Sequence, residues 1–231
     1  MERSDIKYSQ YLQILREELL PAMGCTEPIA MAYAAAKARQ TLGAMPDKID
    51  IVISGNIIKN VKSVVVPNTG GLKGIAAAVA AGTVVGDADK QLEVLSFVKP
   101  EEIPQIGKFM DECQMTVMKS ESGKLLDIDL HMYKGTDRVR LRICDYHTNI
   151  VLIEKNGQVL LKRDENAVAG SETDRSVLNV HDILDFAESV RIEDVRDMLE
   201  RQIDYNLAIS EEGLRGNYGA SIGKTLLETR G

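Results

Sequence analysis

The feature that most constrains the fold is a series of five short apolar segments, rich in β-branched residues, between residues 115 and 163. Each segment has the composition of a β-strand, and only a few residues separate it from the next. The five predicted strands are Met115–Lys119, Leu125–Tyr133, Arg138–Tyr146, Ile150–Glu154 and Val159–Arg163. Parallel neighbours need a crossover of about a dozen residues or more, which these gaps do not allow. The sequence therefore predicts an α+β fold with a mainly antiparallel sheet packed with helices.

The residues before this series alternate between helical and strand patterns. Apolar spacing and capping residues predict helices at Ser9–Leu20, Thr26–Leu42, Leu72–Val85 and Pro100–Asp111. Runs of β-branched residues predict further strands at Ile49–Ser54, Val61–Val66 and Leu92–Val98. The helix at residues 72–85 is rich in Ala and Gly, so we expect it to pack closely against its neighbours.

From Val180 onward, apolar residues recur at steps of three and four, which predicts a C-terminal helical extension. We therefore expect two parts: an α+β domain at residues 1–170, which carries the substrate-loop motif described below, and a helical segment at residues 171–231. Because the pattern is still helical at Gly231, we interpret the second part as the start of a truncated helical domain. Self-association through these helices is expected, since a truncated helical domain leaves apolar surface uncovered.

Composition excludes several classes of function. The chain has 28 basic and 35 acidic residues, a net charge of −7, and no Trp. An acidic chain repels phosphate backbones, so nucleic-acid binding is disfavoured. There is no apolar run of the length that a membrane span needs and no signal-peptide pattern, so we expect a cytoplasmic protein without a membrane anchor. The three cysteines, Cys25, Cys113 and Cys144, form no C-x-x-C pair.

The first candidate site is Cys25 in the segment Ala22–Pro28. It comes directly before a predicted helix, where the positive end of the helix dipole favours a thiolate. A thiolate attacks electrophiles and binds metal ions. The alternative is a buried thiol in a turn between two helices.

The second candidate is the strand-to-helix turn Pro67-Asn68-Thr69-Gly70-Gly71-Leu72-Lys73-Gly74. A glycine-containing turn that enters a helix presents backbone N–H groups to a carboxylate or phosphate. The spacing is not that of a nucleotide P-loop. The turn is equally consistent with a purely structural connection. Lys73 beside three glycines also leaves open a pyridoxal-phosphate site.

The third candidate is the segment Ser210–Thr225, which narrowly misses the P-loop spacing and follows a helix rather than a strand. Its four glycines, at 213, 216, 219 and 223, would share one helix face and allow close packing. Alternatively, Arg215, Asn217 and Tyr218 would donate hydrogen bonds to a carboxylate. Among the three histidines, His147 is the best catalytic candidate because it follows a predicted strand beside Asp145.

Taken together, MGCTEP, VPNTGGLKG and ISEEGLRGNYGASIGK resemble, in order and placement, the iron–sulfur L-cysteine desulfidase family. That family is related to the alpha chain of iron–sulfur L-serine dehydratases. The resemblance implies an α,β-elimination that converts L-cysteine to pyruvate, sulfide and ammonia. It also implies a [4Fe-4S] cluster in which one iron lacks a protein ligand and acts as a Lewis acid.

The resemblance implies a role for each candidate. Cys25 would be a ligand of the cluster or, alternatively, a base. The turn residues Asn68, Thr69, Gly70 and Gly71 would bind the carboxylate and amino group of a small amino acid. The same cleft would include the three residues of the third segment, Arg215, Asn217 and Tyr218.

Family members are longer and carry their other cluster cysteines in a C-terminal half that this sequence does not contain. Cys113 and Cys144 do not match those cysteine motifs. We therefore interpret the chain as an N-terminal portion that by itself binds no stable cluster and is inactive. The alternatives are an L-serine dehydratase, a non-catalytic amino-acid-binding module, and a subunit that completes its cluster with a partner chain.

Overall fold

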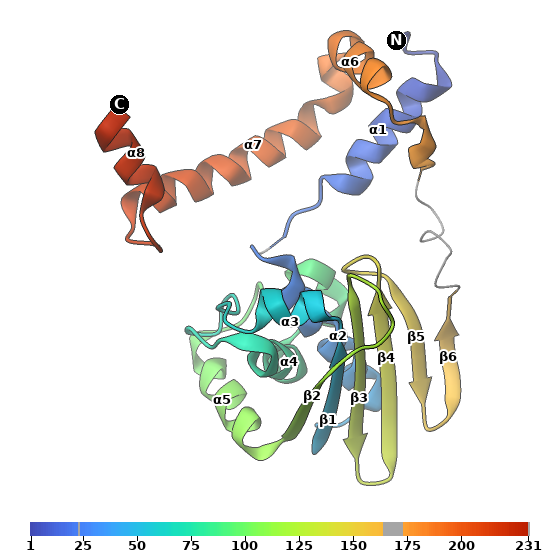
Figure 1. The fold of residues 1–231 in the computed structure, drawn as a ribbon, viewed down its shortest axis with the longest axis vertical. Coiled ribbons are helices and arrows are strands. Elements are labelled where there is room, and N and C mark those ends of the chain that lie inside the picture. The colour runs from blue at the N-terminus through green and yellow to red at the C-terminus, as the bar shows by residue number, and fades with distance from the viewer. Residues whose placement is uncertain (23, 164–172, 231) are drawn as a thin grey trace. The chain divides into compact units, whose positions relative to one another are not determined.

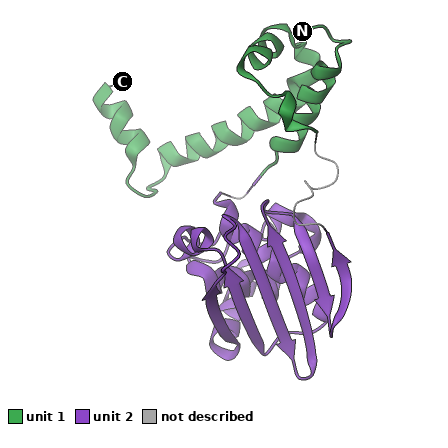
Figure 2. Cartoon of the chain, turned by 45° about the vertical axis from the view of Figure 1, so that its right-hand side comes forward, with its two compact units in different colours: residues 1–21, 171–231 green, residues 22–170 purple. Residues whose placement is uncertain are grey.

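The computed structural model describes residues 1–22, 24–163 and 173–230, which belong to two compact units (Figure 2). Unit 1 consists of Met1–Pro21 and Ser171–Gly231, and unit 2 consists of Ala22–Gly170. The expected boundary near residue 170 therefore coincides with the start of the helical extension. The first 21 residues, which we expected in the α+β domain, group with that extension instead, because their aromatic side chains pack against it.

Unit 2 is built on one six-stranded sheet with the order β2-β1-β3-β4-β5-β6 (Figure 1). The strands are β1 Lys48–Ile53, β2 Gln114–Lys119, β3 Asp127–Lys134, β4 Asp137–Cys144, β5 Ile150–Lys155 and β6 Gln158–Lys162. All neighbouring pairs are antiparallel except β1 and β2. The predicted α+β class and the mainly antiparallel sheet are thus confirmed. The one parallel pair arises because several helices lie between β1 and β2 in the chain.

The helices of unit 2 are α2 Thr26–Leu42, α3 Gly55–Val61, α4 Gly74–Val85 and α5 Ile103–Glu112. Two predicted strands are wrong. The segment 61–66 forms the end of α3 and one isolated bridge between Val65 and Lys73, since Ser54 caps a helix directly after β1. Within 92–98, a short 3-10 helix, Ala88–Glu93, leads into turns that bury Leu95. Apolar residues of both segments are buried in the hydrophobic core, although neither segment is a strand of the sheet.

Helices α2 and α4 pack against each other at backbone distance, as the small residues of α4 led us to expect. A Cβ atom added to Gly82 would lie 2.0 Å from the Ala32 carbonyl oxygen, and one added to Gly86 would lie 2.9 Å from Ala36 Cβ. A step of four residues along α4 thus matches a step of four along α2, so the two helices run parallel. Their N-termini consequently lie at the same end of unit 2.

Unit 1 contains α1 Ile6–Glu18, α6 Val180–Ser189, α7 Ile192–Arg215 and α8 Ile222–Arg230, which confirms the helical extension (Figure 1). Its core is small: Phe186 packs against Tyr8 and Tyr11, with ring centroids 5.4 and 5.1 Å apart. Within the described ranges, none of the helices combines the length and the apolar character that crossing a membrane requires.

Candidate functional site

Cys25 is the N-cap residue of α2, and its side chain is exposed. Thr26 is the first residue of the helix, as the sequence predicted. The Cys25 thiol donates a hydrogen bond to Glu27 Oε2 at 3.1 Å. Desolvation and then this hydrogen bond to the carboxylate raise the pKa of the thiol, although the Glu27 backbone N–H acts in the opposite direction. The geometry therefore favours a thiol here, not the thiolate that the helix dipole suggested.

Glu27 is held on both of its carboxylate oxygens. Asn60, near the end of α3, donates its side-chain N–H to Glu27 Oε1 at 3.0 Å, while the Cys25 thiol occupies Oε2. Burial opposes ionisation, but the hydrogen bonds from Cys25, the Glu27 backbone N–H and Asn60 lower the pKa of Glu27 below its usual value. Glu27 is thus a fixed carboxylate beside an accessible thiol.

His147, in the turn after β4, lies in the same group of side chains. We call this group, which consists of Cys25, Thr26, Glu27, Asn60 and His147, the Cys25 cluster. The His147 Nε2 atom lies 3.0 Å from the Thr26 hydroxyl, and the His147 side chain is half-buried. Burial lowers the pKa of His147, and only the nearby Glu27 charge opposes that shift. The imidazole is therefore favoured in its neutral form, which is the form that accepts a proton.

The turn at residues 67–74 uses its predicted polar side chains to hold its own shape. Asn68 donates to the Leu95 carbonyl at 3.0 Å, and the buried Thr69 hydroxyl donates to the Val66 carbonyl at 2.8 Å. Asn68, Gly70 and Gly71 all have positive φ, a conformation that glycine adopts without strain. The Thr69 side chain thus faces the interior, so a carboxylate at this turn would meet the exposed backbone of Gly70 and Gly71.

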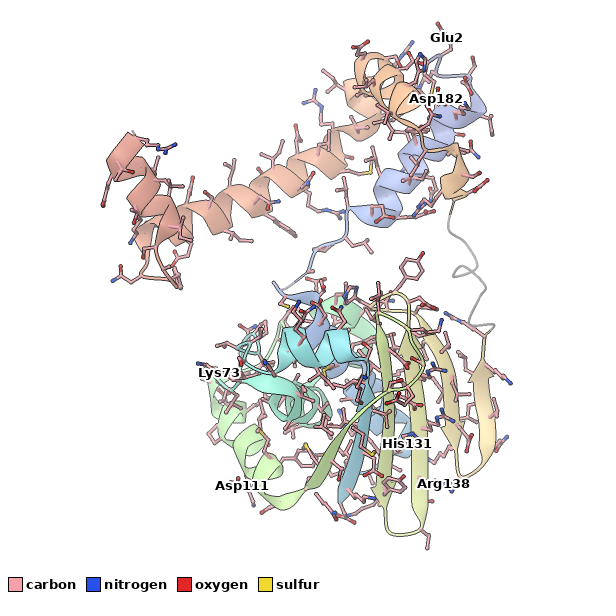
Figure 3. All side chains as sticks on the ribbon, viewed as in Figure 1. Glu2, Lys73, Asp111, His131, Arg138 and Asp182 are labelled. Atoms are coloured by element: carbon pink, nitrogen blue, oxygen red, sulfur yellow. The ribbon has the colours of Figure 1, made fainter. Side chains whose placement is uncertain are left out.

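The parallel packing of α2 and α4 places the first two candidates at the same end of unit 2. Counting eight residues back from the matched pair Gly82 and Ala32 leads to Gly74 at the start of α4 and to Gly24 beside Cys25. Asn60 adds a second link, because it contacts Glu27 and precedes the turn by only a few residues. Lys73, the exposed N-cap residue of α4, is labelled on unit 2 in Figure 3.

Arg215, Asn217 and Tyr218 lie near one another in unit 1, where α7 ends and a turn leads to α8. The Tyr218 hydroxyl donates to Glu212 at 2.6 Å, and Arg215 pairs with the same carboxylate at 3.3 Å. Lys224 donates to Asn217 Oδ1 at 3.3 Å. The four glycines do not share one helix face, because α7 ends at Arg215 and Gly219 adopts a turn with positive φ. A common cleft with the turn of unit 2 stays a prediction.

Of the three cysteines, Cys25 alone has an exposed thiol that could bind a metal cluster. Cys113 and Cys144 are buried, and burial raises the pKa of each thiol to about 11. In the part of the chain that the structure describes, no group of three or more Cys, His, Asp or Glu side chains is arranged to hold a metal ion. These residues do not fit a complete [4Fe-4S] site, although Cys25 is placed to contribute one ligand.

Two members of the Cys25 cluster, Glu27 and Asn60, were not assigned a role from the sequence. Glu27 lies within the MGCTEP segment, so its place two residues after Cys25 was a usable signal. Asn60 carries no local signal, because α3 brings it to Glu27 only in the folded chain. Of the other histidines, His131 pairs with Asp129 at 3.3 Å on β3, and His181 is exposed on α6. Neither lies in the Cys25 cluster.

Comparison with known proteins identifies relatives along the whole chain. The chain is 54% identical to a UPF0597 protein of Desulfitobacterium hafniense over 232 residues, which cover 100% of this chain and 54% of the relative. It is 46% identical to a UPF0597 protein of Lachnoclostridium phytofermentans, with 97% and 54% covered, and 44% identical to one of Treponema denticola, with 96% and 52% covered. The chain thus spans about half the length of these curated relatives. Their names assign no reaction, and no family model or solved structure matches.

Proposed function

We propose that the chain is the N-terminal part of a [4Fe-4S]-dependent amino-acid lyase of the L-cysteine desulfidase type. What carries the proposal is the parallel packing of α2 and α4, which sets the exposed Cys25 thiol and the Pro67–Gly74 turn at one end of unit 2. The Cys25 side chain binds metal ions when it is a thiolate. The Pro67–Gly74 turn presents backbone N–H groups that suit an anion. A small amino acid that spans the two would present its carboxylate to the turn and its β-substituent toward Cys25.

Charge around the turn supports a carboxylate ligand. Residues 54–86 contain three lysines and no acidic residue, although the chain as a whole carries a charge of −7. All three lysines, Lys59, Lys62 and Lys73, are exposed. A local positive field of this kind raises the concentration of an anionic group at the turn.

The elimination requires loss of a proton from the α-carbon and departure of the β-substituent. The cluster, when bound, would polarise the leaving group as a Lewis acid. His147, half-buried and favoured in its neutral form, is the group of this chain that we assign to accept a proton. Glu27 and Asn60 hold the Cys25 side chain in place. The aminoacrylate product then hydrolyses in water to pyruvate and ammonia.

The test uses the full-length protein after anaerobic reconstitution with iron and sulfide. We expect pyruvate release from L-cysteine or L-serine, and loss of that release in Cys25→Ala. The matched control is Cys113→Ala. It removes a buried thiol that lies outside the Cys25 cluster, so the activity should be kept. The preferred amino acid distinguishes a desulfidase from a dehydratase. If a cluster forms but neither amino acid yields pyruvate, the proposal fails, and saturable binding without turnover would indicate an amino-acid-binding module.

A further inference from the structure

A pocket lies where α2 and α4 end, at the opposite end of the pair from Cys25. It is an open hollow of about 370 Å³ that is lined by Ala36, Arg39 and Gln40 of α2 and by Gly86, Asp87 and Ala88 after α4. Pockets that hold small molecules begin at about 300 Å³, so a ligand of a few heavy atoms fits. Along α2, Arg39 lies 14 residues beyond Cys25, which is about 20 Å at the rise of an α-helix. This pocket is therefore separate from the Cys25 cluster.

Arg39 is partly buried, and its Nε atom is enclosed without a hydrogen-bond partner. Its Nε is the one buried side-chain nitrogen or oxygen without a partner among the residues that the structure describes. Leaving a buried donor unsatisfied costs about 1–3 kcal/mol, and more for a charged group. A planar carboxylate accepts two parallel N–H bonds from a guanidinium, so it is the group that best satisfies Arg39.

The other polar groups of the pocket suit the remainder of an amino acid. Asp87 lines the pocket and does not pair with Arg39, and one of its oxygens accepts the Asp89 backbone N–H at 3.0 Å. Its second oxygen and the last carbonyl groups of α4 are acceptors for an ammonium group. The Gln40 carbonyl accepts from Lys37 at 2.8 Å, so its amide nitrogen is the atom that can donate to a ligand.

Gly86 keeps the pocket open where α4 approaches α2. A Cβ atom at this position would lie 2.5 Å from the Gly82 carbonyl oxygen and 2.9 Å from Ala36 Cβ. A residue with a side chain here would have to push the two helices apart or occupy the pocket. The pocket thus depends on the same small-residue contact that aligns the helices.

We propose that this pocket is a second binding site for a small zwitterionic α-amino acid, with its carboxylate on Arg39 and its ammonium group on Asp87. One cationic and one anionic side chain that face the same space without pairing match a ligand that carries both charges and is neutral overall. The proposal does not depend on the lyase activity, since none of its residues belongs to the Cys25 cluster.

The experiment follows the Arg39 Nε–H signal by nuclear magnetic resonance in the purified 231-residue chain while glycine or L-serine is added. We expect a saturable shift of this signal. Arg39→Met should weaken glycine binding, measured by calorimetry, at least tenfold, and Arg39→Lys should weaken it by less. The matched control is Arg16→Met, which also removes an arginine from the last turn of a helix and should leave binding unchanged.

Three results would overturn the proposal. The first is the absence of a saturable Arg39 shift at millimolar glycine. The second is equal affinity for glycine and for acetate, which lacks the ammonium group. The third is unchanged binding in an Arg39→Met chain that keeps the thermal unfolding profile of the unsubstituted chain. Cys25→Ala should retain the binding, so failure of the lyase proposal and failure of this one are distinguishable.

Discussion

The two units bury their apolar residues to very different extents. In unit 2 a continuous core joins α2 and α4 to the inner face of the sheet, and most of its members are fully buried. In unit 1 the buried cluster is an aromatic group of three residues, Tyr8, Tyr11 and Phe186, and Ile14 and Val195 are buried beside few other apolar side chains. Farther along that unit, Ile209 is 71% and Ile222 is 67% exposed. Unit 2 therefore has the packing of a self-sufficient domain, whereas α7 and α8 leave large apolar side chains exposed.

The second half of α7 carries exposed apolar residues on two opposite sides of the helix. At about 100° per residue, Ile203 and Leu207 point to one side of the helix, and Tyr205 and Ile209 point to the opposite side. All four are more than half exposed. A helix with apolar residues on opposite sides is typical of one that is covered from two directions. Such a helix gains little from packing on a single neighbour.

The largest expected effect is at the α2–α4 contact. Gly82→Val places a branched side chain where even a Cβ atom would lie 2.0 Å from the Ala32 carbonyl oxygen. Because backbone must separate to admit it, we expect a loss of more than about 4 kcal/mol in the free energy of unfolding of unit 2. Chemical denaturation measures this. The control is Gly213→Ala in α7, where the space is open and alanine should stabilise the helix by about 0.5–1 kcal/mol. Similar losses at both positions would refute the contrast between the units.

The next effect concerns the aromatic core of unit 1. Phe186→Ala removes the ring that contacts Tyr8 and Tyr11, at a cost of about 3 kcal/mol. Since so few side chains form this core, we expect α1 and α6 to lose protection in hydrogen exchange while the β-strands of unit 2 keep theirs. Loss of protection in both units together would mean that they unfold as one cooperative structure.

A smaller effect is expected on self-association, which we propose to occur through α7 and α8. Ile209→Glu puts a charge among the exposed apolar residues of α7. It should raise the dissociation constant of self-association about tenfold, or about 1.4 kcal/mol. Light scattering over a range of concentrations measures the change. Val159→Glu, at an exposed position on β6, serves as the control. If the unsubstituted chain is monomeric at every concentration, the proposed association is wrong.

The smallest effect is on the acid stability of unit 1. The hydrogen bond from Lys7, followed by that from Asn179, lowers the pKa of Asp182 to about 2 (Figure 3). Because the folded pKa lies below the unfolded value of about 3.9, this carboxylate contributes stability above pH 4 and loses it as the pH falls toward 2. Asp182→Asn should therefore flatten the acid dependence of helix content in that range. Asp204→Asn, on the exposed part of α7, should not change it.

Local patterns in the sequence were sufficient for most elements of unit 2. Short gaps between β-branched segments predicted the antiparallel order of β3 to β6, and small residues predicted the close contact of α4. The patterns failed at 61–66 and 92–98, because an apolar run buried in a turn has the same composition as a strand. They also placed the first 21 residues in the wrong unit, since the partners of Tyr8 and Tyr11 lie more than 160 residues away.

The candidate site divides in the same way. Cys25 and the glycine-containing turn were recognisable from residue type and position relative to helix starts. The link from Asn60 to Glu27 was not, because α3 brings Asn60 to α2 only in the folded chain. The Thr69 and Cys25 side chains bond to neighbours three and two residues away, so their roles depend on the exact shape of the local turn.

By itself, the sequence determined the α+β class, the helical extension and the two segments that form the ends of the candidate site. These follow from periodicity, from glycine placement and from loop lengths, all of which act over a few residues. The tertiary structure alone decided that α2 and α4 run parallel, that Asn60 reaches Glu27, and that Arg39 Nε remains without a partner in the pocket at the far end of these two helices. The physical reason is that burial and charge pairing depend on residues brought together from distant parts of the chain.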